Sequence, residues 1–162
     1  MVYRSRRSAT DLDDETFEEF AAGAGVRLRR AFVAAYGPER GADAVAEALG
    51  YAWEHWRRVR RMDNPLGYLY RVGQTRTRPR KVPTAGGWDL PAAREHNFEP
   101  GLVTAVASLS EAQRVAVVLV HGYGWTLREV AELTGVTVST VQTHVERALA
   151  KLRAALEVVD DA

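Results

Sequence analysis

The stretch TLREVAELTGVTVSTVQTHVERALAKL, residues 126–152, decides the fold of this chain. It begins with a threonine followed three residues later by a glutamate, the spacing of a capping box that satisfies amide groups at the start of a helix. Ala131, Gly135 and Val141 then supply a small residue where two helices cross, a glycine able to take positive φ in the turn, and an apolar anchor. The pattern predicts a helix-turn-helix.

The second helix of this motif is expected to be capped by Thr137 and to bury one side. The buried stripe is predicted to contain Val138, Val141, Val145, Ala148, Leu149, Leu152 and Leu156. The opposite side would enter the major groove of DNA with Ser139, Thr140, Gln142, Thr143, Glu146 and Arg147. Gln142 can read adenine through both ends of its amide. An ordinary helical hairpin that binds no nucleic acid is the alternative interpretation.

The formal net charge of +1 conceals an uneven distribution of charge. Residues 1–81 carry 16 basic and 11 acidic side chains, whereas residues 82–162 carry 6 and 10. Most of the excess lies in residues 57–81, where nine cations face one carboxylate. Cations displace counterions from nucleic acid, so this basic block is expected to make most phosphate contacts and the helix-turn-helix alone to bind weakly. A solvated charged face is the alternative.

Composition excludes several classes of protein. A content of 46% hydrophobic and 27% charged residues is typical of a folded, soluble chain. No apolar run approaches the roughly 20 residues of a membrane span, and no signal core follows the Arg-rich start, so we expect a cytoplasmic protein. The chain has no cysteine, and its 4 histidines lack metal-ligand spacing, so no metal and no cofactor are expected. No nucleophile–base pair or phosphate-cradling loop indicates an enzyme.

Three further helices are predicted before residue 81. Apolar residues recur at helical spacing over residues 17–35, until Tyr36-Gly37-Pro38 breaks the pattern. A second stripe over residues 45–59 predicts one long helix, with Trp53 and Trp56 in the core. Asn64-Pro65 then reads as the cap and first-turn proline of a third helix. The apolar run 115–120 is also taken as helical, because its neighbours are.

The predicted fold class is all-α, with two small helical domains joined by a flexible linker. Prolines and glycines accumulate between residues 81 and 101 while helical periodicity stops. The expected division is a first domain over residues 10–81, a linker over 82–101 and a helix-turn-helix domain over 102–157. Whether the two domains touch is left open by the sequence.

Residues 109–156, LSEAQRVAVVLVHGYGWTLREVAELTGVTVSTVQTHVERALAKLRAAL, resemble region 4 of the bacterial sigma factors. They are also similar to the effector domain of LuxR-type regulators. The front half distinguishes the two, because ADAVAEALGYAWEHW and MDNPLGYLYRVGQTRTR resemble region 2 of the extracytoplasmic-function (ECF) sigma factors. A LuxR-type response regulator would need an α/β receiver, for which no strand pattern is present.

The resemblance implies a subunit that joins core RNA polymerase, directs it to particular promoters and helps to open the duplex. It further implies that Asp43 and Glu47 dock on the clamp helices of the largest polymerase subunit, although exposed helix carboxylates are the alternative. Ala46 stands where many members have glutamine. The implied partners are promoter DNA, core RNA polymerase and an anti-sigma factor, without a membrane.

By the same resemblance, the loop 59–64 receives an unstacked base of the minus-10 element. Tyr68 matches an aromatic that stacks on single-stranded DNA, with packing at the core or its rim as the alternative. The candidate contacts of the first domain are Arg60, Arg61, Met62, Asp63, Asn64, Tyr68, Arg71, Gln74, Arg76 and Arg78.

The resemblance assigns the helix-turn-helix to the minus-35 element. Gln142, His144 and Leu149 stand where members commonly have Lys or Arg, which predicts weak or altered minus-35 binding. Two alternatives to a sigma factor stay open here. One is a sigma-like or LuxR-like regulator that does not act as a polymerase subunit, and the other is a module that binds protein partners through the same faces.

Overall fold

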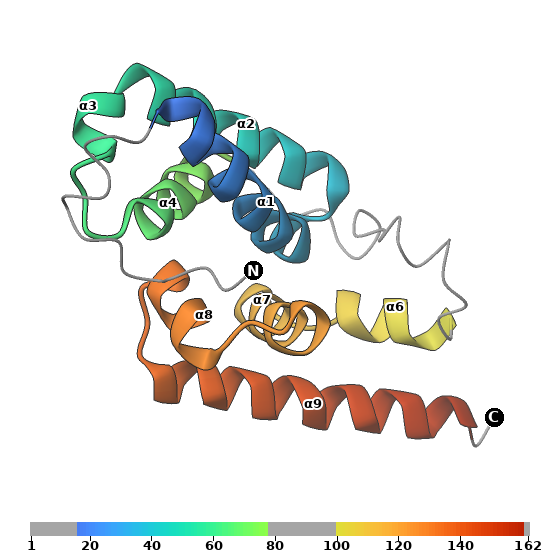
Figure 1. Ribbon diagram of the computed structural model, residues 1–162. Coiled ribbons are helices and arrows are strands. Elements are labelled where there is room, and N and C mark those ends of the chain that lie inside the picture. The colour runs from blue at the N-terminus through green and yellow to red at the C-terminus, as the bar shows by residue number, and fades with distance from the viewer. Residues whose placement is uncertain (1–15, 78–99, 161–162) are drawn as a thin grey trace.

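The computed structural model describes residues 16–77 and 100–160, and the side chains of residues 16–77 and 101–157. Its described parts contain helices and turns but no strand, which confirms the predicted all-α class (Figure 1). The first unit comprises α1 (Phe17–Tyr36), α2 (Pro38–Glu54), α3 (Trp56–Val59) and α4 (Pro65–Thr77). The second unit comprises α6 (Pro100–Ala107), α7 (Glu111–Val117), the π-helical turn η1 (Val118–Gly122), α8 (Leu127–Thr134) and α9 (Val138–Asp160).

Helices α1 and α2 form a tight pair. Thr16 caps α1, and the helix ends at Gly37, whose φ of 85° is readily available only to glycine. Pro38 starts α2 directly afterwards. A Cβ atom at Gly41 would lie 2.8 Å from the backbone nitrogen of Val33, so the glycine is needed where the helices approach. The predicted first helix and its break are confirmed.

The prediction of one continuous helix over residues 45–59 is wrong, because α2 ends at Glu54. His55 leaves the helical region with φ −118° and ψ 27°, and its ring Nδ1 lies 3.0 Å from the carbonyl oxygen of Tyr51. This side chain competes for a carbonyl of the last turn of α2. The short helix α3 follows and places Val59 in the core.

The assignment of Trp53 to the core is also wrong, because this side chain is 62% exposed. The buried side of α2 is instead lined by small residues at every fourth or third position: Gly41, Ala44, Ala48 and Ala52. These let α2 lie close to α1, and Trp53 points about 100° away from that line. Its ring packs edge-on against Phe17 at 5.0 Å. Trp56 is half-buried against Phe17 and Phe20.

Helix α4 is capped at its start and packs against α1 and α2. The Asn64 side chain accepts a hydrogen bond from the Gly67 amide at 3.0 Å, as predicted for a cap. Leu66, Leu69 and Tyr70 are buried, and burial raises the pKa of the Tyr70 phenol well above its usual value. Gly73 lies directly against the ring of Phe32. This packing sets which face of α4 remains available to a ligand.

The helix-turn-helix is formed by α8 and α9 as predicted. Thr126 and Glu129 form the capping box, and Gly135 ends α8 in the left-handed region with φ 73°. The Thr140 amide donates to the Thr137 hydroxyl at 3.2 Å. The prediction that Val138 belongs to the buried stripe of α9 is wrong. Val138, the first residue of α9, is 42% exposed, whereas Val141 one turn later is buried.

The two units pack directly against each other, which answers the question that the sequence left open. Helix α1 packs against α7, and α4 packs against α8 (Figure 1). Val115, Leu119 and Trp125 of the second unit belong to the same apolar cluster as Leu28 and Phe32 of the first. The predicted linker 82–101 lies outside the described residues except for its last two, which already belong to α6. None of the described helices is long and apolar enough to span a membrane.

Candidate nucleic-acid interface

The predicted recognition face of α9 is accessible. Ser139, Gln142, Glu146 and Arg147 are exposed, and Thr140 and Thr143 are half-buried. Val141, Val145 and Ala148 are buried on the opposite side, as expected. The helix therefore presents a polar surface from a firmly packed base, the arrangement that a recognition helix requires.

Several polar groups on this face are already oriented by one another. The Gln142 amide donates to the Glu146 carboxylate at 3.1 Å, and the Thr143 hydroxyl donates to the Ser139 carbonyl at 3.0 Å. The Thr137 hydroxyl lies 2.8 Å from that of Thr140. Glu146 thus holds Gln142 against the helix and adds a negative charge, so reading a base with Gln142 would cost this hydrogen bond.

A second candidate surface lies where α3 turns into α4. Arg61, Asp63 and Asn64 are exposed, whereas Arg60 and Met62 are half-buried. The exposed amide of Asn64 does two things at once, because its oxygen caps α4 and its nitrogen donates to the Glu132 carbonyl of α8 at 2.8 Å. The loop is therefore both a candidate DNA contact and a contact between the units.

Tyr68 lies on the rim of the first unit. Its hydroxyl lies 3.1 Å from that of Tyr51, with the ring centroids 5.8 Å apart. This hydrogen bond is the main reason that the pKa of Tyr51 is raised. The Arg58 guanidinium lies 5.8 Å from the centre of the Tyr68 ring. A half-buried tyrosine with a cation over its ring suits stacking against a base, since its other contacts hold it in place.

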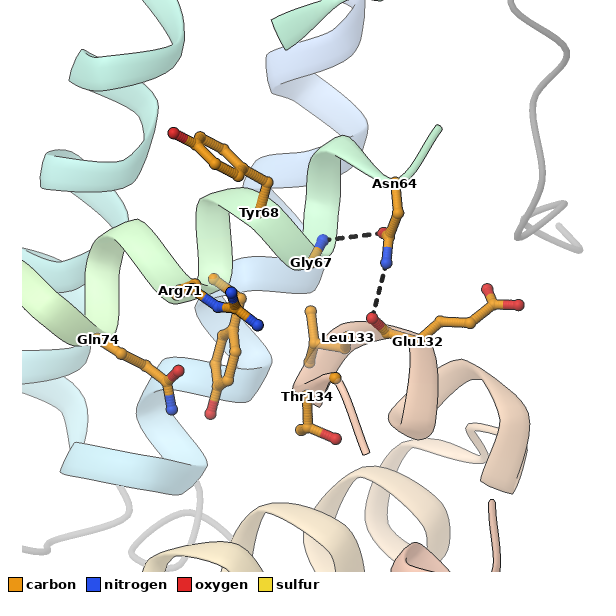
Figure 2. Close-up of a pocket in the computed structure, with 10 residues that line it drawn as sticks. Asn64, Gly67, Tyr68, Arg71, Gln74, Glu132, Leu133 and Thr134 are labelled. Atoms are coloured by element: carbon orange, nitrogen blue, oxygen red, sulfur yellow. Dashed lines mark hydrogen bonds between the residues drawn. The ribbon is translucent and has the colours of Figure 1, made fainter. Parts of the chain in front are cut away.

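Arg71 and Gln74 follow on the next turns of α4 and face the second unit. A cavity of about 210 Å³ separates α4 from the carboxyl end of α8, and it is lined by Arg71, Gln74, Glu132 and Thr134 among others. Figure 2 shows Arg71 reaching from α4 toward the α8 side, while Tyr68 points the other way. The two units therefore share this part of the candidate DNA surface.

The predicted polymerase-binding carboxylates lie on the outer face of α2. Asp43, Ala46 and Glu47 are all exposed. Glu47 is paired with Arg76 of α4, with oxygen and nitrogen 3.3 Å apart. The structure thus links a candidate polymerase contact with a candidate DNA contact. Arg78, the last predicted contact of the first unit, lies outside the described residues.

Sequence reasoning missed the most extensively bonded side chain of the interface between the units. Arg114 of α7 donates from Nε to the Ala34 carbonyl at 2.7 Å and from Nη2 to the Ala35 carbonyl at 2.6 Å. It also donates from Nη1 to the Leu109 carbonyl at 2.8 Å. Burial lowers the pKa of this guanidinium. A single arginine inside the apolar run around residue 115 was the signal that could have revealed it.

Comparisons with known proteins agree with this architecture. The family model described as Sigma-70, region 4 matches residues 101–152. An RNA polymerase sigma-E factor of Streptomyces antibioticus is 33% identical over 128 residues, covering 73% of this chain and 71% of that protein. The sigma factor RpoE from Bartonella quintana, solved in complex with the anti-sigma factor NepR, has the same fold. Its TM-score is 0.58 at 20% identity, covering 88% of this chain and 97% of that chain.

Together, the helix-turn-helix and the basic, aromatic-bearing helical unit beside it define a two-part DNA-binding transcription protein. The similarity to the Streptomyces protein extends over most of both chains, which is more of this chain than either unit alone contains. The chain belongs to the sigma factors of bacterial RNA polymerase and is of the ECF type. It directs promoter-specific transcription initiation with core polymerase, and the LuxR-type alternative is not favoured.

Proposed function

We propose that the two units divide promoter recognition, with α9 reading the minus-35 element and the first unit reading the minus-10 element. The observation that carries this proposal is the polar face of α9, exposed along Ser139, Gln142 and Arg147 above a buried apolar side. One cation and one carboxylate on that face give little attraction for phosphate. Contacts from α9 therefore select sequence more than they supply affinity.

The minus-10 element is read by the loop 60–64 together with the outer face of α4. Asn64 offers an amide at the start of this surface, and Tyr68 offers a ring held by Tyr51 and Arg58. Arg71 and Gln74 continue the surface along the helix. A strand that stacks one base on Tyr68 gains roughly 1–3 kcal/mol, which offsets the cost of unstacking that base from the duplex.

Core polymerase docks on the exposed side of α2. Asp43 and Glu47 are one turn apart on this side, and the positions between and beyond them are the small residues Ala46 and Gly50. Small side chains allow a partner helix to approach α2 closely. Ala46, which lacks the hydrogen-bonding group of glutamine, leaves recognition to the two carboxylates and the shape of the face.

The remaining expectations follow from this role. The protein acts in the cytoplasm, where the polymerase is, and contributes binding rather than catalysis. The Bartonella relative is bound by an anti-sigma factor, and we extend to this chain a protein regulator of that kind. No cofactor takes part.

Run-off transcription with purified core polymerase on genomic fragments tests the proposal. The wild-type chain should create new start sites, and the double variant Asp43→Asn/Glu47→Gln should lose most of them while still binding DNA. Arg153→Gln removes an exposed charge at the far end of α9 and serves as the control. If the wild-type chain creates no start site, the proposed function is wrong.

A further inference from the structure

The first turn of α9 carries an apolar side chain that faces solvent. Val138 opens the helix and is exposed, although the next valine of the same helix, Val141, lies in the core. Single exposed apolar residues are common on protein surfaces, so exposure alone assigns no role to Val138. Its position does, because the amino-terminal residues of a recognition helix are the ones that contact base edges in the major groove.

Val138 lies on the same line of α9 as the residue expected to read adenine. Side chains four residues apart on a helix lie one above the other on one face. Val138, Gln142 and Glu146 have this spacing, and all three are exposed. The hydrogen bond of 3.1 Å from Gln142 to Glu146 joins two of them directly. Val138 therefore stands at the amino-terminal end of this line, where a recognition helix comes closest to the bases.

The hydroxyl groups around Val138 are already engaged within the protein. The Thr137 hydroxyl lies 2.8 Å from that of Thr140 and 3.2 Å from that of Ser139. The Thr143 hydroxyl donates to the Ser139 carbonyl at 3.0 Å. Reading a base through one of these hydroxyls would cost or share an existing hydrogen bond, whereas an apolar contact from Val138 would cost none.

An exposed methyl group in the major groove has a specific complement in DNA. Thymine alone carries a C5-methyl group there, and apolar side chains recognise it by direct contact. Phosphate contacts do not distinguish one base from another, so the cation of this face, Arg147, adds no selectivity of that kind. Neutral contacts must therefore supply most of the base selectivity of α9.

We propose that Val138 is a specificity-determining residue that selects thymine by contact between its methyl groups and the C5-methyl group of the base. The thymine lies at a fixed, short distance from the adenine read by Gln142, because both side chains project from one face of one helix. This role replaces the buried one that the sequence pattern predicts for Val138. The inference rests on the reading role proposed for α9.

A library of short duplexes with a random central segment tests this inference without polymerase. The library is prepared once with thymine and once with uracil, which differs from thymine by the methyl group alone. The two preparations carry different flanking tags and compete for the full-length chain, in which the reading face of α9 is exposed. Sequencing of the bound duplexes gives the base preference at each position.

Three substitutions separate the methyl contact from other effects. Val138→Ser removes both methyl groups at an exposed site and leaves the buried Val141 in place. Val136→Ser is the matched control, because this valine is 39% exposed but precedes the helix. Gln142→Ala removes the adenine contact alone. Thermal unfolding followed by circular dichroism checks that each variant folds as the wild-type chain does.

The wild-type chain should select thymine at one position and bind it about fourfold better than uracil, as expected from the burial of one methyl group. Val138→Ser should lose this preference and keep the preference for adenine. Gln142→Ala should show the reverse. Val136→Ser should select the same bases as the wild-type chain.

Three results would overturn the inference: no preferred thymine in the wild-type chain, an equal loss of preference in Val136→Ser, or the same discrimination against uracil in Val138→Ser as in the wild-type chain. The last result would mean that duplex shape is read in place of the methyl group. Run-off transcription tests the proposed function separately. New start sites with an unchanged Val138→Ser refute the inference alone, whereas a thymine preference that depends on Val138 without any start site refutes the proposed function alone.

Discussion

Replacing Gly73 by alanine should test how α4 is positioned beneath α1. The added Cβ atom would run into the fully buried ring of Phe32 and would lie 3.0 Å from the backbone oxygen of Ala44. Overpacking of this kind costs up to about 3 kcal/mol. The higher helix propensity of alanine offsets about 1 kcal/mol. The free energy of unfolding should therefore fall by about 2 kcal/mol, which corresponds to roughly 6 °C in Tm for a chain of this size.

Urea and thermal unfolding followed by far-ultraviolet circular dichroism measure this change. Gly50→Ala is the matched control, because it makes the same replacement within a helix but adds its Cβ to open space. It should raise the free energy of unfolding by about 0.5–1 kcal/mol. If Gly73→Ala proves as stable as Gly50→Ala, the close contact between α4 and Phe32 does not exist and the reasoning is refuted.

Three further predictions concern α9 and the first unit. Gln142→Ala should relax base preference at the minus-35 element, whereas Arg147→Ala should weaken binding to all sequences alike; equal losses across a promoter library would contradict this division. The hydrogen bond to Tyr68 raises the pKa of Tyr51. The folding stability that this bond contributes is therefore fully present below pH 10.0 and is lost as the pH rises through the raised pKa. Tyr51→Phe should therefore flatten the alkaline fall in stability, measured by urea unfolding at several pH values. Glu47→Gln should change stability by less than about 0.5 kcal/mol, since its ion pair is exposed, yet weaken binding to core polymerase in a pull-down titration.

Local chemistry made the helix-turn-helix predictable from sequence. The Thr126 capping box and the left-handed Gly135 depend on residues a few positions apart, so their spacing alone reveals them. Asn64 was likewise identified as a cap, because the amide that it accepts from is three residues away. Its second hydrogen bond, to a carbonyl 68 residues later, has no local pattern.

Packing between helices accounts for what the sequence did not reveal. Trp53 continues an apolar stripe in the sequence, but Ala44, Ala48 and Ala52 bring α2 so close to α1 that these small side chains occupy the core. Hydrophobicity ranks a tryptophan above an alanine, whereas close helix packing selects the smaller residue. The partners of Arg114 are two carbonyl groups of α1, and no side-chain pattern marks a backbone carbonyl as a binding site.

With the roles proposed for Glu47 and Arg76, their ion pair would link polymerase binding thermodynamically to promoter binding. Arg76 cannot hold the same geometry toward Glu47 and toward a phosphate, and Glu47 cannot serve both Arg76 and a cation of the polymerase. Polymerase docking that recruits Glu47 would therefore free Arg76 for DNA, and DNA that recruits Arg76 would free Glu47 to the same extent. For an exposed pair the coupling is small, about twofold to fivefold in affinity. Each partner would then favour the other, and the complete ternary complex over either binary one.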